Sequence, residues 1–349
     1  MEKIKKYLST ILTLSAQPGN KSVARQLTEM LLLFIRSRLG PGFYLLARMY
    51  RQDFPLRDVL SYLSTAGYKR QVYRLNNRLY HKSSQNKVIE KAVLMAYGQP
   101  TPELLGHYDS VDGLTTDGSS LRTAADLKAL LEKQQDKTRI CFKLIESWGG
   151  QGFRAIEYHS EGQVKDLETG TWLGTDSFIS SIDKTEEGGV LIEKYLEQHP
   201  DYAAINQSSV NTLRIGVLKK RDGTVDCLLA FLRAGRPGAI VDNTTVGGIL
   251  FPIDVATGVA GAGYTKNQPR VFYQDHPDSL TRLAGTRMPM FTEAVELAKN
   301  SLHVFPEIRF AGVDIAFSVA GPVILELNIY PDYNDFTIAR LPSRNALTV

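Results

Sequence analysis

Cysteine and long apolar runs are both scarce in this 349-residue sequence. The two cysteines, Cys141 and Cys227, lie in separate apolar runs, which excludes a disulfide framework and a cysteine metal site and fits a reducing compartment. The best apolar run, Met30 to Ile35, has six residues, whereas a membrane-spanning helix needs about 20. The basic N-terminus is followed by a stretch that hydroxyl side chains interrupt and that lacks a small-residue cleavage site. We therefore expect a cytoplasmic protein that is not secreted.

Acidic residues are scarce in the first quarter of the chain. Residues Met1 to Lys91 contain about seventeen lysines and arginines against about five acidic residues, although the whole chain has a net charge of only +4. Such a segment fits an anionic membrane face, phosphate-bearing substrates or nucleic acid, and it equally fits helices with solvated basic faces. Zinc-finger spacing, an aromatic RNA-binding motif and a long basic tract are absent, so nucleic acid is an unlikely partner. Peripheral contact with an anionic inner membrane face stays open.

The overall composition is that of a globular protein, with 43% hydrophobic and 22% charged residues, which excludes general disorder. The length predicts about two domains, or one large unit with an accessory region. Helical spacing of apolar residues predicts a mainly helical region over about the first 85 residues. The predicted helices are Ala24 to Arg38, Phe43 to Tyr50, Val59 to Ala66 and a segment from Tyr68 to Tyr80, before a polar break at His81 to Asn86.

From Lys87 onward the pattern predicts an α+β architecture with antiparallel strand pairs. The predicted helices are Val88 to Tyr97, Asp126 to Glu132, a segment from Ser177 and Glu293 to Leu302. The predicted strands are Arg139 to Ile145, Ala155 to Tyr158, Gln163 to Leu167, Val190 to Leu196, Leu213 to Lys219, Asp226 to Arg233, Arg309 to Phe317 and Gly321 to Leu327.

The first motif with chemical meaning is a lysine strand followed by glycines. Lys143 lies in a predicted strand, and Gly149, Gly150 and Gly152 follow it in a turn. Glycines let backbone N–H groups approach phosphate oxygens, and a nearby ammonium adds positive charge. A glycine-rich turn between strands is more often an ordinary hairpin, so this motif alone does not identify a phosphate site.

Two weaker motifs follow. The strand ending at Glu193 could place adenine against its backbone, with the carboxylate accepting from the amino group, but taken alone this motif favours an ordinary strand end. Asn211 and Arg214 lie near the start of another apolar strand, and a buried arginine there needs an anionic partner, either a structural carboxylate or a ligand. Asn243 and Gly247 lie in a second glycine-rich turn.

The sharpest motif joins the last two predicted strands. A short turn links them, so Asp314 can face Glu326 across the hairpin. Asn328 is two residues beyond Glu326 and therefore points to the same side of the sheet. Two carboxylates and an amide oxygen are hard ligands suited to Mg²⁺, and burying both acids without a cation would be costly. We predict a metal site at Asp314, Glu326 and Asn328.

In this order the four motifs resemble the ATP-grasp fold, in which two α+β subdomains clamp ATP. The segments Ile192 to Ile215 and Gly312 to Asn328 resemble more narrowly the sugar-transfer-associated branch of that family, and the likeness extends from about Lys87 to Asp335. It implies a basic helical region at 1–85, a linker or small subdomain at 86–135, an A subdomain with the glycine loop and adenine hinge at 136–196, and a B subdomain with the metal and phosphate site at 197–349.

The resemblance also implies the role of each residue. Lys143 and the backbone of Gly149, Gly150 and Gly152 would hold the ATP phosphates, and Arg214 would clamp the transferred phosphoryl group or the substrate carboxylate. The remaining nucleotide contacts would come from Glu193, Lys194, Tyr195, Leu196 and Asn211, with Asn243 and Gly247 on the acceptor side. Asp314, Glu326 and Asn328 would hold Mg²⁺ or Mn²⁺. Lys87 is a candidate for a further positive charge and Glu197 for the ribose contact.

The implied activity is that of an ADP-forming ligase. It would join a small-molecule carboxylate to an amine or thiol through an acylphosphate, and the branch suggests an amino acid–sugar amide in polysaccharide or secondary-metabolite biosynthesis. Two alternatives stay open, a small-molecule phosphotransferase and a non-catalytic nucleotide-binding protein. The intact set Asp314, Glu326 and Asn328 disfavours the non-catalytic alternative, because a site that has lost its function readily loses metal ligands.

Overall fold

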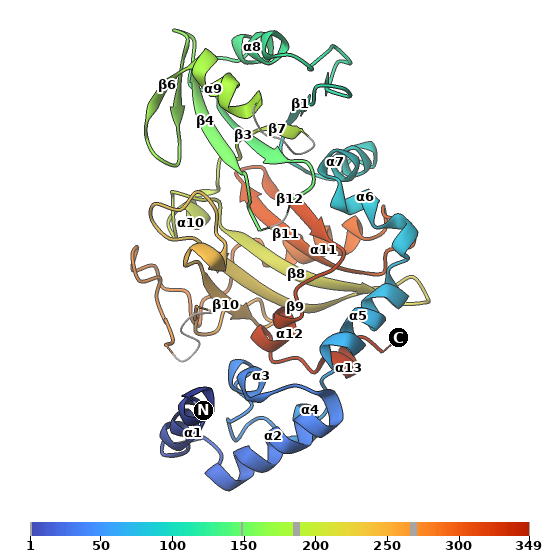
Figure 1. Ribbon diagram of the computed structural model, residues 1–349, viewed down its shortest axis with the longest axis vertical. Helices are drawn as coiled ribbons and strands as arrows, with labels where there is room; N and C mark the ends of the chain where they lie inside the picture. Colours follow the sequence, from blue (N-terminus) through green and yellow to red (C-terminus); the bar gives the residue numbers. More distant parts are fainter. Residues whose placement is uncertain (1, 148, 184–188, 266–270, 349) are drawn as a thin grey trace.

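The chain folds into two antiparallel sheets, one above the other along the long axis, with helices around them (Figure 1). The computed structural model describes residues 2–147, 149–183, 189–265 and 271–348. Trp148, inside the glycine-rich segment, lies outside the described residues. The predicted α+β architecture with antiparallel pairs is confirmed.

The upper sheet has seven strands in the order β2-β1-β7-β3-β4-β5-β6, so that β7 lies between β1 and β3. The strands are β1 (Leu104–Tyr108), β2 (Leu114–Thr115), β3 (Arg139–Leu144), β4 (Arg154–His159), β5 (Gln163–Asp166), β6 (Trp172–Gly174) and β7 (Val190–Lys194). Sequence analysis predicted four of them but missed β1, β2 and β6, which are short or lack clear alternation.

The lower sheet has five strands in the order β10-β9-β8-β11-β12. The strands are β8 (Thr212–Lys219), β9 (Val225–Ala234), β10 (Ile249–Ile253), β11 (Phe310–Ser318) and β12 (Gly321–Asn328). Strands β8 and β11 read as almost continuous apolar runs because both of their faces are covered. A side chain on one face of these strands reaches a core, and its neighbour in sequence points the opposite way.

The helices are short apart from α1 and α2. They are α1 (Glu2–Ser15), α2 (Val23–Ser37), α3 (Pro41–Leu46), α4 (Leu56–Val59), α5 (Thr65–Leu75), α6 (Lys82–Gln85), α7 (Lys87–Ala96), α8 (Ala124–Glu132), α9 (Thr175–Asp183), α10 (Pro200–Ala203), α11 (Phe291–Ser301), α12 (Asn334–Ile338) and α13 (Ser343–Ala346), with 3₁₀ turns η1 (Arg78–Tyr80) and η2 (Thr244–Val246).

Capping side chains explain where several helices begin. Thr123 and Asp126 form a reciprocal capping box at the start of α8. Ser64 accepts a hydrogen bond from the Gly67 N–H and begins α5 at Thr65, so the single helix predicted over Val59 to Ala66 is wrong. The predicted polar break at His81 to Asn86 is also wrong in part, because it contains α6.

Three large apolar cores and one small cluster around Cys141, Ala155 and Ile240 are formed by the described residues. Helices α8 and α9 pack on the upper sheet, and α11 packs on one face of the lower sheet. The other face of the lower sheet shares a single core with α1 to α5 and with the C-terminal helices, so that Leu33 and Val72 belong to the same cluster as Phe231 and Phe336. The basic N-terminal helices therefore stabilise the lower sheet directly. The division of the chain into ranges 1–85, 86–135, 136–196 and 197–349 stays a prediction.

Helix α2 has polar side chains on its buried face. Glu29 accepts hydrogen bonds from Lys21 Nζ at 2.7 Å, Tyr44 Oη at 2.7 Å and Arg25 Nε at 3.0 Å. Lys21 is only 1% exposed and also donates to the Phe54 carbonyl. Because Glu29, Lys21 and Tyr44 are buried, each of these three groups requires its partner, whereas Arg25 is exposed.

We expect the Glu29→Ala variant to lose about 3–5 kcal/mol of unfolding free energy, because it leaves the Lys21 ammonium buried without its carboxylate. Urea unfolding followed by tyrosine fluorescence measures this loss. Arg25→Ala is the matched control, because Arg25 contacts the same carboxylate from an exposed position and its loss should cost no more than about 1 kcal/mol. Equal stabilities of the two variants would contradict the buried pair.

Candidate functional site

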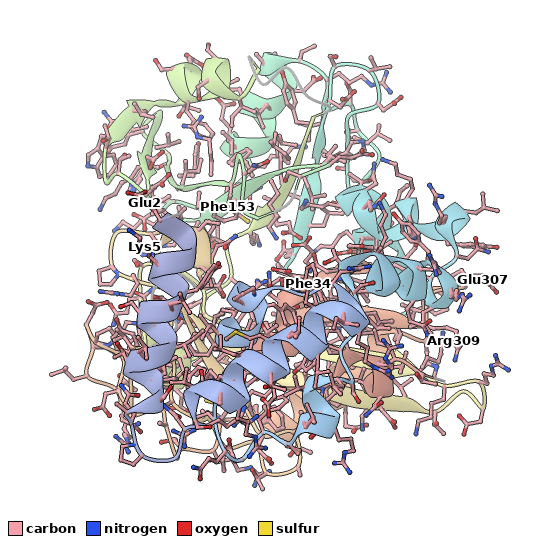
Figure 2. All side chains as sticks on the ribbon, turned by 60° about the horizontal axis from the view of Figure 1, so that its bottom comes forward. Glu2, Lys5, Phe34, Phe153, Glu307 and Arg309 are labelled. Carbon is pink, nitrogen blue, oxygen red and sulfur yellow. The ribbon has the colours of Figure 1, made fainter. Side chains whose placement is uncertain are left out.

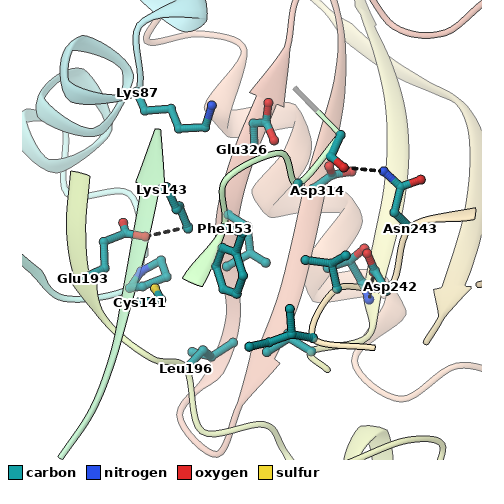
Figure 3. Close-up of a pocket in the computed structure, with 18 of the residues that line it drawn as sticks. Lys87, Cys141, Lys143, Phe153, Glu193, Leu196, Asp242, Asn243, Asp314 and Glu326 are labelled. Atoms are coloured by element: carbon teal, nitrogen blue, oxygen red, sulfur yellow. Dashed lines mark hydrogen bonds and ion pairs between the residues drawn. The ribbon is translucent and has the colours of Figure 1, made fainter. Parts of the chain in front are cut away.

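A cavity lies between the two sheets and brings together residues from distant parts of the chain (Figure 3). The upper sheet and α7 contribute basic side chains, the glycine loop closes one side, and β8, β9, β11 and β12 form the opposite wall. The predicted site residues that line it are Lys143, Gly149, Gly150, Glu193, Lys194, Tyr195, Leu196, Arg214, Asn243, Asp314, Glu326 and Asn328.

Glu193 on β7 is the counter-ion of two lysines. Its carboxylate forms ion pairs with Lys143 Nζ at 2.5 Å and with Lys91 Nζ (Figure 3 shows the Lys143 pair). Burial alone would lower the pKa of Lys143, but the Glu193 charge outweighs burial and holds that pKa above its usual value. Burial would raise the pKa of Glu193, and the two ammonium groups instead hold it low. Glu193 therefore fixes a charged lysine at the cavity wall.

Lys87, at the first turn of α7, supplies a second ammonium group. Its Nζ donates to the Ser147 carbonyl at 2.7 Å, and its side chain points toward Glu326 across the cavity (Figure 3). Burial lowers the pKa of Lys87, and the Glu326 carboxylate opposes that shift. Lys87 and Lys143 thus place two cationic groups on the same side of the cavity.

The glycine loop lies against the segment 240–243 of the lower half. Gly149, Gly150 and Gly152 all have positive φ, between 66° and 77°, a region that side chains disfavour. The Asn243 amide donates to the Gly149 carbonyl at 2.9 Å. A Cβ on Gly152 would collide with Leu144 and not with anything in the cavity, so this glycine shapes the turn while Gly149 and Gly150 line the cavity.

The hinge after β7 offers one free backbone donor to the cavity. The N–H groups of Lys194 and Tyr195 donate to the carbonyls of Glu103 and Arg139. The N–H of Leu196 has no acceptor among the described residues. Glu197, the candidate ribose ligand, does not line this cavity and instead lies in an adjoining hollow on the other side of the hinge.

Arg214 lies in the interior of the opposite wall. Its Nε and Nη2 donate to the Asp314 carboxylate, the latter at 2.9 Å, and its Nη1 is 3.5 Å from Asp335. Arg233 on β9 donates to Asp314 at 3.1 Å. Burial would raise the pKa of Asp314, but the two guanidinium groups hold it below its usual value. The sequence left open whether the anionic partner of Arg214 is a structural carboxylate or a ligand. In the structure its partners are the carboxylates of Asp314 and Asp335.

The predicted metal ligands do converge. Asp314 and Glu326 are register partners on β11 and β12, and both line the cavity together with Asn328. The Glu326 carboxylate makes no hydrogen bond or ion pair with any described residue, and the buried Asn328 amide nitrogen has no partner there either. Among the described residues no group of three or more His, Cys, Asp or Glu side chains could hold a metal. The available oxygen donors are therefore Glu326 and Asn328, and Asp314 is already shared by two arginines.

Two further residues of the predicted site, Asn211 and Gly247, do not line the cavity. The Asn211 amide is fully buried, donates to the carbonyls of Tyr202 and Asn206 at 2.9 and 3.0 Å, and accepts from the Gly235 N–H. Gly247 ends the 3₁₀ turn η2 with a positive φ of 93°. The structure does not bring either residue to the cavity, because Asn211 holds the loop before β8 and Gly247 closes a turn.

Three cavity-side residues were missed by sequence analysis. Lys91 follows Lys87 by four positions on α7, so helical spacing could have indicated a shared face. Asp242 and Arg233 gave no such signal, since each lies at the end of a separate segment.

Asp242 accepts from the Thr212 N–H at 3.0 Å and from the Thr212 hydroxyl at 2.5 Å. Burial raises the pKa of Asp242 to about 6, although Arg233 and Thr212 oppose the shift.

The comparisons with known proteins agree with this architecture. The family model described as sugar-transfer associated ATP-grasp matches residues 67–346. The chain therefore belongs to the sugar-transfer-associated ATP-grasp family, and its fold is the ATP-grasp fold preceded by helices, as the sequence predicted. The search of curated proteins finds no significant match.

Several solved structures are distantly similar. An L-amino acid ligase from Bacillus licheniformis is 11% identical with a TM-score of 0.41, over 76% of this chain and 48% of that one. A D-alanine–D-alanine ligase from Bacillus anthracis is 13% identical with a TM-score of 0.39, over 73% and 60%. An N5-carboxyaminoimidazole synthase from Aspergillus clavatus, in complex with ADP, is 13% identical with a TM-score of 0.40, over 77% and 51%. The chain spans about half the length of most of these structures.

We expect Asp314→Ala to lower the unfolding free energy by about 3–5 kcal/mol, because it leaves Arg214 and Arg233 without their shared buried carboxylate. The stabilisation from Asp314 is present above its unfolded-state pKa of about 4 and disappears as the pH falls through its lower folded-state pKa. Chemical denaturation at several pH values measures both effects. An Asp314→Ala variant as stable as the wild type would contradict the network.

The contribution of Asp242 to the unfolding free energy should change with pH in the opposite direction to that of Asp314. Its folded-state pKa of about 6 exceeds the unfolded value, so its contribution is fully present below pH of about 4 and is lost as the pH rises through 6. We expect the stability of the wild type relative to Asp242→Asn to fall across this window. Denaturation of both proteins from acid to neutral pH measures the difference, and parallel pH profiles would show that Asp242 titrates normally.

Proposed function

We propose that the protein is an ATP- and Mg²⁺-dependent ligase that joins a small-molecule carboxylate to an amine through an acylphosphate. One observation carries the proposal. Lys87, Lys143 and the glycine loop lie on one side of the cavity, and the unpaired Glu326 carboxylate and Asn328 lie on the other. Cations for phosphate on one wall and free oxygen donors on the facing wall suit a metal–nucleotide complex better than an apolar ligand.

In this proposal the upper wall binds ATP. Lys143, kept charged by Glu193, and Lys87 neutralise the phosphates, and the backbone of Gly149 and Gly150 covers them. The adenine edge accepts a hydrogen bond from the free Leu196 N–H. Glu193 was predicted to contact adenine, but its carboxylate is shared between Lys91 and Lys143, so here it orients the phosphate-binding lysine.

Glu326 and Asn328 would hold the magnesium ion, with Asp314 beside them on the neighbouring strand. When bound, magnesium neutralises the charge on the β- and γ-phosphates. Arg233 is the better candidate for the substrate carboxylate or transferred phosphoryl group, because it is less buried than Arg214 and has one carboxylate partner. Arg214 is a positioning residue in this proposal, since each of its three nitrogens has a carboxylate partner.

The proposed reaction needs no protein nucleophile. A substrate carboxylate oxygen attacks the γ-phosphorus, and the bond between the γ-phosphorus and the β-phosphate oxygen breaks. ADP is the leaving group, and the substrate becomes an acylphosphate. The amine then attacks the carbonyl carbon, inorganic phosphate departs, and the nitrogen loses a proton. Held reactants and fixed positive charge supply the catalysis. The description of the family as sugar-transfer associated supports an acceptor that is a sugar or is linked to one.

We expect phosphorus NMR of the protein with ATP, Mg²⁺ and a small-molecule extract of its host cells to show ADP and inorganic phosphate only when the extract is present. Glu326→Gln should reduce this turnover at least about 100-fold, because it removes the carboxylate charge that would bind Mg²⁺ while keeping the shape of the side chain. Glu146→Gln is the matched control, since Glu146 is exposed and pairs with Lys82 outside the cavity.

Two outcomes would overturn the proposal. A new phosphoester resonance with ADP would identify a phosphotransferase, the alternative that the sequence left open. Wild-type turnover in Glu326→Gln would remove the assigned metal site, provided that the variant unfolds at the same temperature as the wild type.

A further inference from the structure

Helix α2 has apolar side chains on its outer face as well as on its inner face, where Met30 and Leu33 are buried. Glu29 and Gln26 face the interior, whereas Leu31 is 59% exposed and Ile35 is 63% exposed. Helix α1 lies beside α2, and Leu12 on it is 60% exposed. Figure 2 shows both helices at the front of the molecule with no other element covering them. The apolar outer face consists of Leu8, Leu12, Leu27, Leu31, Phe34 and Ile35.

Exposed apolar residues are common singly but not as a continuous helical stripe. Positions 27, 31, 34 and 35 follow the i, i+4, i+7, i+8 spacing of one helix face. In a helix that packs only on its own protein, that face would be directed inward. Here the inward face already has its own apolar residues, Met30 and Leu33, beside the polar Gln26 and Glu29. The outer stripe is therefore additional to the face that packs on the core.

Basic side chains surround this apolar outer face. Lys5, Lys6, Arg25, Arg36 and Arg38 on the same two helices are all exposed, and the Arg38 guanidinium lies 5.5 Å from the centre of the Phe34 ring. Of the five acidic residues in the first 91, two are buried and two form ion pairs with arginines. These are Glu29, Glu90, Asp53 and Asp58, which leaves Glu2.

An arginine-lined hollow adjoins the end of α2. Arg36, which directly follows Ile35, lines it together with Arg70, Arg74 and Arg344. No acidic side chain lines this hollow, and none of the four guanidinium groups has an ion-pair partner among the described residues. The Arg344 Nε is buried and has no hydrogen-bond partner in the described part of the chain. Four convergent guanidinium groups without a carboxylate suit phosphate oxygens.

We propose that the apolar outer face of α1 and α2 docks onto an anionic lipid bilayer, with lipid phosphate groups bound by the surrounding lysines and by the arginine-lined hollow. A helix that combines an exposed Leu/Phe/Ile stripe with flanking Lys and Arg lies in the plane of the membrane interface, its apolar side chains among the acyl chains. The cations add affinity for anionic headgroups. No helix among the described residues is long and apolar enough to cross a membrane.

The same charges disfavour a second copy of the chain as the occupant. A two-fold contact through this face would bring identical patches together, and with them the lysines and arginines of both copies. Like charges placed together at an interface are strongly unfavourable. An anionic bilayer satisfies the apolar stripe and the basic surround at once.

Flotation of the full-length protein with lipid vesicles tests this proposal. We expect binding to vesicles of phosphatidylcholine mixed with phosphatidylglycerol, weaker binding to phosphatidylcholine alone, and loss of the difference at high salt. The Leu31→Ser/Phe34→Ser/Ile35→Ser variant should bind at least about tenfold less, because it removes the inserted side chains. Arg70→Ala/Arg74→Ala should reduce binding to the anionic vesicles about 25-fold, since each of the two basic residues near the surface contributes about fivefold.

The matched control is Val111→Ser/Val319→Ser, which removes two exposed apolar residues from turns of the two sheets. It should float like the wild type, and all variants should keep the wild-type unfolding temperature because the altered side chains are exposed. Failure of the wild type to float with anionic vesicles would overturn the proposal. So would equal flotation of the triple variant, or a dimer in sedimentation that the triple variant loses while neither protein floats. Each of these results leaves the ligase assignment untouched, because the ligase is measured by turnover without lipid.

Discussion

The buried network of Arg214, Arg233 and Asp314 is the constraint on which the site depends. It joins β8, β9 and β11, and Asp335 ties in the C-terminal helix α12. Buried charges of this kind hold only while every partner is present, because each alone would be stranded in a medium that solvates it poorly. The strands must therefore keep one register. The neighbouring register of β11 with β12 then places Asp314 opposite Glu326, and both residues line the cavity.

Sequence reasoning succeeded where the chemistry lies on adjacent strands. Two apolar runs joined by a short turn predict the hairpin of β11 and β12, and a register shift between Asp314 and Ile315 brings Asp314 opposite Glu326. Lys143 and the glycines after it were likewise within one local segment. The order of the motifs suggested the family, and the match over residues 67–346 confirmed that family.

Sequence reasoning failed where partners come from distant segments. The role of Glu193 is set by Lys91, which lies on a helix about a hundred residues earlier, and no local pattern shows that pairing. Asn211 was predicted to contact the nucleotide, but its side-chain amide donates to the carbonyls of Tyr202 and Asn206 instead. Helix α2 was predicted correctly as a helix, yet periodicity alone could not tell which of its two faces is buried. Tertiary contacts decide all three cases.

The position of β7 has a consequence for how the molecule folds. This strand lies between β1 and β3, so its backbone is paired on one side with residues 104–108 and on the other with residues 139–144. A fragment cut at residues 136–196 would leave one edge of an apolar strand bare, and such edges recruit other chains into aggregates. The upper sheet is therefore complete only when residues 104–108 have paired with β7, which lies far along the chain. Formation of this sheet is a non-local step in folding.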